Sequence, residues 1–259
     1  MSNLPLSIFM ICQDEEERIG DALEVLKGLT DDVVIVDSGS TDETLNIAKR
    51  YTDRIYHKDW NGYGEQKVYA QSLCQYDWVL NLDADEILQP NVVSEIRQIF
   101  KTSEDKRAAA YSLRFCHVGF LSKRKKPRLF CPVNVTPRLY DRRRAGFKDS
   151  TVHDKVVTYD GSKPVVLKGD VAHVSFKSFG HLWLKAHGYA ALQAEDWYNK
   201  GKKPSILKII FDPFFVFLKQ YFLRRFFALG VEGFILSFMF AGVRALRLGL
   251  VLETFKAKQ

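Results

Sequence analysis

The chain has 259 residues, of which 46% are hydrophobic and 27% are charged, and its formal net charge is +7. This composition excludes a disordered chain, and the length suits one large domain or one domain with an appendage. The positive charge favours an anionic partner, such as a membrane surface, a nucleotide or a nucleic acid.

The cysteines and the N-terminal segment indicate the compartment. Cys12, Cys74, Cys116 and Cys131 form no C-x-x-C pair, and each lies in or beside an apolar segment. This spacing argues against structural zinc and a disulfide framework, and it predicts four reduced packing residues. The N-terminal segment has no basic start and only a short apolar run, so we expect neither a signal peptide nor an anchor, and a cytoplasmic protein.

The first hundred residues alternate between predicted strands and helices. Strands are expected at 6–12, 32–37, 53–59 and 77–85. Helices are expected at 14–29, after the loop that follows residue 37, at 62–76 and at 90–101. Alternation of this kind predicts an α/β fold with a mostly parallel sheet, in which ligands bind at the carboxyl ends of the strands.

The second half of the chain has a different pattern. Strands are expected at 108–120 and 135–143, followed by a hairpin over 157–176 and a helix over 179–200. These segments predict a domain over 1–203, divided into a ligand-binding half (1–100) and an acceptor half (101–203). The remaining residues, 204–259, form a separate region.

The C-terminal region is rich in phenylalanine, with basic residues interspersed. Its longest stretch without a basic residue, 226–243, contains Glu232. A spanning helix needs about 20 mostly apolar residues. We therefore expect amphipathic helices that lie in a membrane interface, with simple packing on the domain as the alternative.

Acidic residues follow the fourth predicted strand. In WVLNLDADEIL, Asp83, Asp85 and Glu86 come directly after an apolar run. Clustered carboxylates repel one another and lose hydration when partly buried, so a positive group should lie close by. Because side chains alternate along a strand, Asp83 and Asp85 are expected to point the same way. Two such ligands suit Mg²⁺ or Mn²⁺ with positions open for diphosphate oxygens, and a solvated turn is the alternative.

Two further candidates precede this cluster. Asp37 ends the second predicted strand and is followed by a tight loop, so it can accept hydrogen bonds from a uracil or ribose group. Lys67 lies one turn into a helix that starts with two glycines, which permit close backbone approach, and it can reach a phosphate. An ordinary exposed lysine is the alternative for Lys67.

Four segments resemble the family 2 glycosyltransferases: SIFMICQDEEERI, VVIVDSGSTDET, GYGEQKVYA and LNLDADE, in this order and at suitable spacing. The resemblance covers residues 4–100 strongly. It continues more weakly through VHDKV, HVSFKS and the aromatic tail, which are similar to bacterial enzymes that add a β-linked glucose or a similar sugar to the lipopolysaccharide inner core. It implies a Rossmann-like GT-A fold and a metal-dependent, inverting transfer from a UDP-sugar.

The resemblance also implies roles for residues of the first half. Gln13 and Glu15 would line the uridine site, Asp37 would contact the nucleotide, and Lys67 would lie near the base or the diphosphate. The family often has Asn-Glu-Glu where this chain has Asp-Glu-Glu at 14–16, so the nucleobase contact is open.

The metal ligands are expected to come from both halves of the domain. Asp83 and Asp85 would hold the metal and the donor ribose, with Asp85 as the preferred direct ligand. His173, in VAHVSFKS, is a candidate third ligand through an imidazole nitrogen. A hydrogen-bonded structural histidine is the alternative.

Inverting transfer by direct displacement needs a base roughly opposite the leaving diphosphate. STVHDKVV offers Asp154 as this base, with Asp149 as the alternate. The related family pattern usually ends in His-Glu, so the shorter aspartate is a departure. A turn acid paired with Lys155 or Arg144 is the other interpretation of Asp154.

Basic stretches at 122–128 and 141–146 hold eight basic residues between them. They would flank the acceptor half and contact a lipopolysaccharide core or the anionic cytoplasmic face of the inner membrane, with solvated surface charge as the alternative. No nucleic-acid recognition module is present, so no nucleic-acid partner is expected.

Three alternatives to this function stay open. The acceptor can be a polyprenyl phosphate instead of a lipopolysaccharide core. A phosphohydrolase of the haloacid dehalogenase type also carries D-x-D after an apolar strand, although there the motif normally opens the fold. A membrane-surface adaptor without catalytic activity is the third.

Overall fold

The computed structural model describes residues 2–122, 125–147 and 155–258. They form two compact units, which we call the sheet unit (up to residue 116, and 134–173) and the helical unit (117–133, and from 174 onward). The sequence predicted a division near residue 203. The structure places helix α5 (Phe179–Asn199) in the helical unit because it packs against helix α7 (Val231–Ala257).

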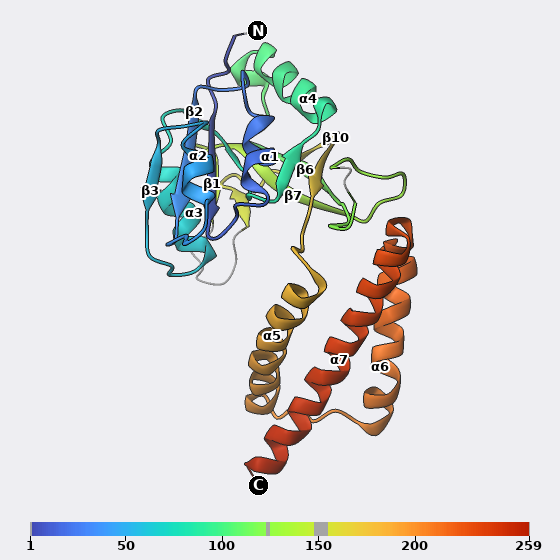
Figure 1. Cartoon of the computed structure of the whole chain (residues 1–259). Coiled ribbons are helices and arrows are strands. Elements are labelled where there is room, and N and C mark those ends of the chain that lie inside the picture. Colours follow the sequence, from blue (N-terminus) through green and yellow to red (C-terminus); the bar gives the residue numbers. More distant parts are fainter. Residues whose placement is uncertain (1, 123–124, 148–154, 259) are drawn as a thin grey trace. The chain divides into compact units, whose positions relative to one another are not determined.

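The sheet unit contains an eight-stranded sheet in the order β3-β2-β1-β4-β7-β6-β10-β5 (Figure 1). Its N-terminal half is parallel, since β1 pairs with β2 and β4, and β2 pairs with β3. These strands are β1 (Ser7–Cys12), β2 (Asp32–Asp37), β3 (Ile55–His57) and β4 (Trp78–Asn81). The intervening helices are α1 (Ile19–Glu24), α2 (Thr44–Ala48) and α3 (Tyr63–Ser72). The expected strand–helix alternation is confirmed, although the helix predicted over 14–29 is shorter.

The second half of the sheet introduces antiparallel pairing. β4 pairs with β7 and β10 pairs with β5, both antiparallel. These elements are β5 (Glu86–Leu88), α4 (Pro90–Lys101), β6 (Ala110–His117), β7 (Val133–Asp141) and β10 (Val165–His173), with a short 3₁₀ turn at Glu104–Lys106. The sheet is therefore mixed, and the expected α/β fold is confirmed.

Alternating side chains divide the core into two layers. Ile8 and Met10 of β1 pack in a cluster with α1, α2 and α4, whereas Phe9 and Ile11 pack in a cluster with α3 and with the strands β8 (Ala145–Phe147) and β9 (Val156–Thr158). Both faces of β1 and β2 are covered, which explains why these strands are continuous apolar runs. The four cysteines are buried thiols, as the sequence predicted.

The hairpin predicted over 157–176 does not form. β9 pairs with β8 in a separate two-stranded sheet, whereas β10 lies in the main sheet between β6 and β5. Since neighbours on both sides already occupy the hydrogen-bonding edges of β10, β9 has no edge of β10 to join.

Helix α4 packs closely on β10 at Gly169. A Cβ atom on Gly169 would lie 2.4 Å from the backbone nitrogen of Val92, and the Gly169 N–H donates to Glu95 Oε1 at 2.6 Å. Only a glycine permits this approach, which fixes the course of the strand that ends at His173.

We expect Gly169→Ala to lower the free energy of unfolding by about 1–3 kcal/mol, because the added methyl group must push α4 away from β10. Urea unfolding followed by circular dichroism measures this. Gly20→Ala is the matched control: its Cβ would meet Ile47 Cγ2 at 3.4 Å, so its effect should be small. Equal losses in both variants would contradict the close approach.

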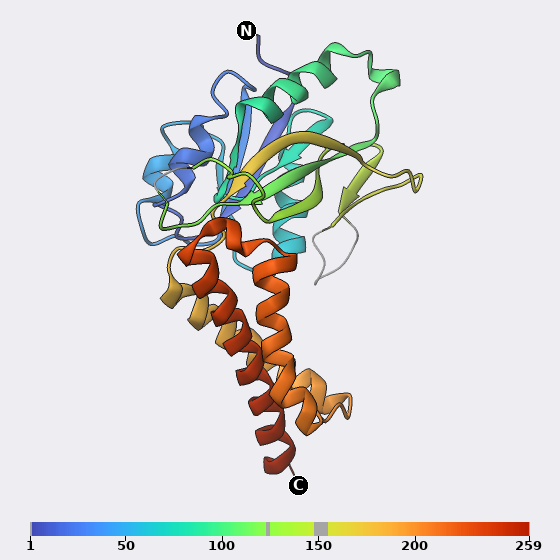
Figure 2. The ribbon, with the colours of Figure 1, turned by 90° about the vertical axis from the view of Figure 1, so that its right-hand side faces the viewer.

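The helical unit is built mainly of the helices α5, α6 and α7 (Figure 2). α7 packs against both α5 and α6 (Ile206–Leu218), and α6 continues through a π-helical turn at Lys219–Leu223 and a 3₁₀ turn at Phe226–Leu229. The helix predicted over 179–200 is confirmed. Among the described helices, α7 alone is long and apolar enough to cross a membrane by length and composition.

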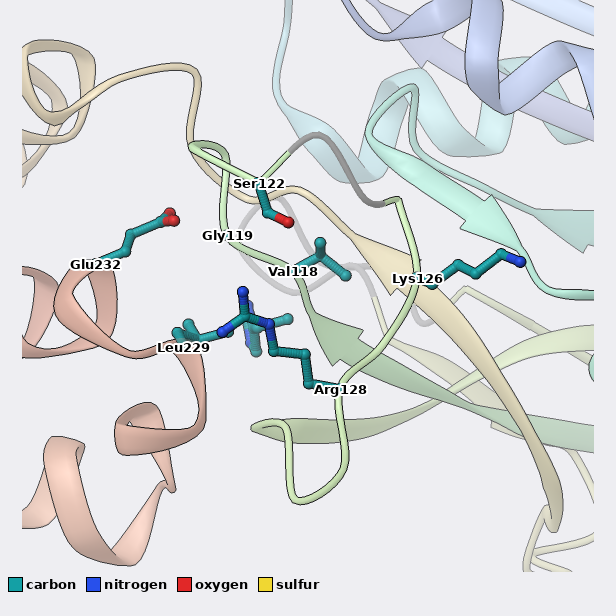
Figure 3. A pocket seen from close by; sticks show the side chains of 8 residues that line it. Val118, Gly119, Ser122, Lys126, Arg128, Leu229 and Glu232 are labelled. Carbon is teal, nitrogen blue, oxygen red and sulfur yellow. The ribbon is translucent and has the colours of Figure 1, made fainter.

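Glu232, in the first turn of α7, forms hydrogen bonds with the loop at residues 120–121, which precedes the basic stretch. Its carboxylate accepts the backbone N–H groups of Phe120 at 2.7 Å and Leu121 at 3.3 Å. Gly119 makes room for it, because a Cβ there would lie 2.1 Å from Glu232 Oε2. The cavity beside them (Figure 3), lined in part by Arg128, has a volume of about 10 Å³, enough for one water molecule.

Glu232→Gln should destabilise the protein by about 1–3 kcal/mol, because an amide offers one acceptor oxygen where the carboxylate offers two. The measurement is the midpoint of urea unfolding, compared between variants whose unfolding free energy depends on urea concentration with the same slope. Glu253→Gln, on the exposed side of the same helix, is the control and should leave the midpoint unchanged. If Glu232→Gln leaves the urea midpoint unchanged, the two backbone hydrogen bonds contribute nothing to stability.

Candidate active site

Asp83 and Asp85 lie in a turn between β4 and β5, and Glu86 is the first residue of β5. β4 ends at Asn81, and the Glu86 N–H donates to the Asp83 carbonyl at 3.0 Å, closing a turn over 83–86. The carboxylate of Glu86 accepts the Asp83 N–H in return, at 2.9 Å. The expected strand alternation therefore does not set the directions of Asp83 and Asp85, and the two side chains have different partners.

Asp83 lies between two basic side chains. Its Oδ2 is 2.9 Å from Arg138 Nη2, and its Oδ1 is 3.4 Å from Lys67 Nζ. Lys67 is 1% exposed, so the alternative of an ordinary exposed lysine is excluded. Its charge therefore acts on Asp83 with little screening by water. Burial raises the pKa of Asp83, but the charges of Arg138 and Lys67 outweigh it and hold the pKa below its ordinary value.

Arg138, on β7, is a site residue that the sequence analysis missed. Its Nη2 also donates to Glu86 Oε1 at 2.9 Å, and its Nη1 donates to Asn81 Oδ1. Glu86 is buried, and burial raises its pKa to about 7 against the opposing charge of Arg138, with the charge of Asp83 adding to the rise. The sequence did contain one indication of such a residue: the excess negative charge of the acidic cluster requires a basic partner.

Asp85 has a separate set of partners. Its Oδ2 lies 3.3 Å from His173 Nε2 and 3.3 Å from Arg18 Nη1. The antiparallel register of β5 and β10 sets His173 opposite Glu86, and this brings the histidine beside the turn. Burial lowers the pKa of His173, but the hydrogen bond and charge of Asp85 reverse this and raise it above its ordinary value.

These groups fit a divalent cation. One ligand atom each from Asp85, Glu86 and His173 lies within 4.8 Å of the others. Two adjacent ligands of Mg²⁺ are separated by about 3 Å, close to the 3.3 Å between Asp85 and His173. Both oxygens of Glu86 already accept hydrogen bonds, so Asp85 and His173 are better placed to bind a cation. Metal binding by Asp83 stays a prediction.

Arg18 connects the turn to the loop after β1. It donates from Nε and Nη2 to the two oxygens of Glu15, each at 2.7 Å, and its Nη1 approaches Asp85. Gln13 is exposed in the same loop. The uridine contacts of Gln13 and Glu15 stay predictions, but the structure places Glu15 one side chain away from the acidic turn.

Asp37 organises its own loop. Its Oδ2 accepts the N–H groups of Gly39 and Ser40, both at 2.9 Å, and its Oδ1 accepts the Ser40 hydroxyl. Asp14, across from this loop, has a left-handed backbone with φ 53° and accepts the Thr41 N–H at 2.8 Å. A nucleotide contact of Asp37 stays a prediction, since its carboxylate is occupied by the loop that would surround the nucleotide. The candidate bases Asp154 and Asp149 lie outside the described residues.

The family model for glycosyl transferase family 2 matches residues 7–164. The chain therefore belongs to glycosyltransferase family 2, as the motifs predicted. An uncharacterized glycosyltransferase of Rickettsia prowazekii is 39% identical over 251 residues, covering 94% of this chain and 85% of the relative.

A second relative has a more specific name. The lipopolysaccharide core biosynthesis glycosyltransferase LpsC of Rhizobium meliloti is 31% identical, covering 90% of this chain and 86% of LpsC. Among solved structures, glucosyl-3-phosphoglycerate synthase from Mycobacterium tuberculosis, in complex with Mg²⁺ and UDP, has a TM-score of 0.34 at 22% identity, covering 45% of this chain and 44% of that one. This similarity is too low to support an argument.

Arg138→Gln should cost about 3–5 kcal/mol of stability, because it leaves the buried Glu86 without its cationic partner. Adding Glu86→Gln to this variant should restore part of the loss, since the uncompensated charge is then removed. Urea unfolding of the two single variants and the double variant gives the coupling energy. Arg50→Gln, at an exposed position, should have little effect. Strictly additive losses would show that the two side chains do not interact.

Proposed function

We propose that the protein transfers a hexose, with glucose as the first candidate, from a UDP-sugar to a lipopolysaccharide core or a related glycolipid, with inversion at the anomeric carbon. The observation that carries this proposal is the Asp85–His173 pair beside a turn whose other two carboxylates are compensated by Arg138. The relation to LpsC supports the acceptor class.

The donor site is proposed to lie at the carboxyl ends of β1, β2 and β4. The loop containing Gln13 and Glu15 follows β1, Asp37 ends β2, and Asp83 follows β4. Parallel pairing of these strands brings their ends to one edge of the sheet, where α/β proteins bind nucleotides. Asp83, held in place by Lys67 and Arg138, would accept hydrogen bonds from the donor ribose.

Asp85 and His173 would hold Mg²⁺ or Mn²⁺. A cation bound there would stabilise the negative charge that develops on the departing diphosphate. Arg18 contacts the same carboxylate and orients it, while Glu15 in turn orients Arg18. Asp154, or Asp149 in its place, would accept the proton of the acceptor hydroxyl as the new bond forms.

The proposed place of action is the cytoplasmic face of the inner membrane, with peripheral attachment. Helix α6 has no buried residue and exposes Ile206, Leu207, Phe211 and Phe215. Such a helix fits a membrane interface, where its apolar side chains leave water. Basic residues near anionic lipids would add on the order of 1 kcal/mol each.

The test is release of UDP from a panel of UDP-sugars, with an acceptor glycolipid and Mn²⁺ or Mg²⁺ present. We expect one donor to be consumed, activity to be lost with a chelator, and Asp85→Asn and His173→Ala each to lower turnover roughly 100-fold. Direct titration of the protein with Mn²⁺ should show weaker binding in both variants.

Asp53→Asn, an exposed aspartate in the sheet unit, is the matched control and should behave as wild type. Full turnover of Asp85→Asn, or of the chelator-treated protein, would refute the metal assignment. Consumption of no UDP-sugar together with release of phosphate from simple monoesters would refute sugar transfer itself.

A further inference from the structure

A cavity of about 400 Å³ lies among α5, α6 and α7 of the helical unit. This volume is within the range of about 300–1,000 Å³ that is usual for small-molecule sites. Its walls are largely apolar, with Leu182 and Ala186 from α5, Val216 from α6, and Phe240 and Val243 from α7. The cavity is therefore large enough to hold part of an apolar ligand.

Two arginines of α7, one turn apart, line the same cavity. Arg244 is paired, since its Nη1 lies 3.1 Å from Asp212 Oδ2. Arg247 donates from Nη1 to the amide oxygen of Gln193 and lies over the ring of Trp197, 5.1 Å from its centroid. In the part of the chain that the structure describes, no carboxylate pairs with Arg247. The cavity thus contains a cation with no direct carboxylate partner, on which Asp212 acts only from its ion pair with Arg244.

Two buried polar atoms of the lining also have no hydrogen-bond partner. They are Nε of Arg247, a donor, and Oε1 of Gln220, an acceptor. Unpaired buried polar groups are destabilising, and native proteins normally satisfy them with protein, water or a ligand. A ligand with an anionic oxygen and a hydroxyl group would satisfy both atoms.

We propose that this cavity binds a phospholipid with an anionic head group. The phosphate oxygens accept hydrogen bonds from Arg247, a head-group hydroxyl donates to Gln220, and an acyl chain lies along the apolar walls. Charge complementarity selects the head group, because a fork of guanidinium donors matches a phosphate. The inference does not depend on the proposed sugar transfer.

The test titrates the full-length protein calorimetrically with dihexanoyl phosphatidylglycerol below its micelle concentration. Dihexanoyl phosphatidylcholine, with the same chains and no net charge, and inorganic phosphate are the comparison ligands. We expect the anionic lipid to bind at least about tenfold more tightly than either, because only it combines the charge with the chains. Equal binding of the neutral lipid, or of phosphate alone, would overturn the proposal.

Variants separate the cavity from the general charge of the protein. Arg247→Gln should weaken binding of the anionic lipid about tenfold, Arg247→Lys should weaken it less, and Ala186→Phe should fill the cavity and abolish binding. Arg224→Gln makes the same charge change at an exposed position outside the cavity and should bind as wild type.

Circular dichroism checks that each variant folds. If Ala186→Phe does not fold, the binding measured with Arg247→Gln and Arg247→Lys decides the outcome. Wild-type binding by Arg247→Gln, or equal weakening by Arg224→Gln, would show that the lipid binds elsewhere. Sugar transfer is not measured, so a negative result leaves the proposed reaction untouched.

Discussion

The arrangement of the site depends on how the chain compensates three carboxylates in four consecutive residues. Arg138 does most of this, because one guanidinium nitrogen donates to both Asp83 and Glu86. In a partly buried turn, two carboxylates at this separation would repel strongly without it. Asp85 has other partners, since its Oδ2 lies 3.3 Å from both Arg18 Nη1 and His173 Nε2. Acids that look equivalent in the sequence thus have different partners in the structure.

The position of His173 depends on a different constraint, which is strand register. β5 has only three residues, yet its pairing with the end of β10 sets His173 opposite Glu86. A shift of one residue would turn the imidazole to the other face of the sheet. The close approach of α4 at Gly169, four residues earlier, fixes where β10 lies against the rest of the unit. Packing along β10 therefore helps to determine whether His173 reaches Asp85.

The sequence predicted the parts of the fold that depend on local patterns. β1, β2 and α4 lie where continuous apolar runs or helical spacing put them, and the acidic cluster follows the fourth strand as expected. Apart from element ends such as those of α1 and β4, the errors concern contacts between distant segments. The pairing of β9 with β8 depends on which sheet edges are already occupied, and no local pattern encodes that.

The same limit explains the missed site residues. No local pattern indicates which basic residue pairs with the acidic cluster, and only the fold brings Arg18 to Asp85 and Arg138 to Asp83. The early end of β4 at Asn81 has a related cause. The side chain of Asn81 hydrogen-bonds to backbone carbonyls and to Arg138, and the chain turns directly after it, so the period of two stops before the acids begin.

Two charged residues of α7, Glu232 and Arg247, are compensated in different ways, and this difference bears on the role of the cavity. Glu232 interrupts an apolar helix, but its carboxylate is satisfied by two backbone N–H groups of the loop at 120–121. Arg247 lies further along the same helix among apolar walls, with an amide and an aromatic ring as its partners. The hydrogen bonds that Glu232 accepts from the chain's own backbone help to stabilise the fold. A guanidinium kept beside a ligand-sized cavity without a carboxylate costs stability in the empty state, and an anion from outside the chain would recover that cost.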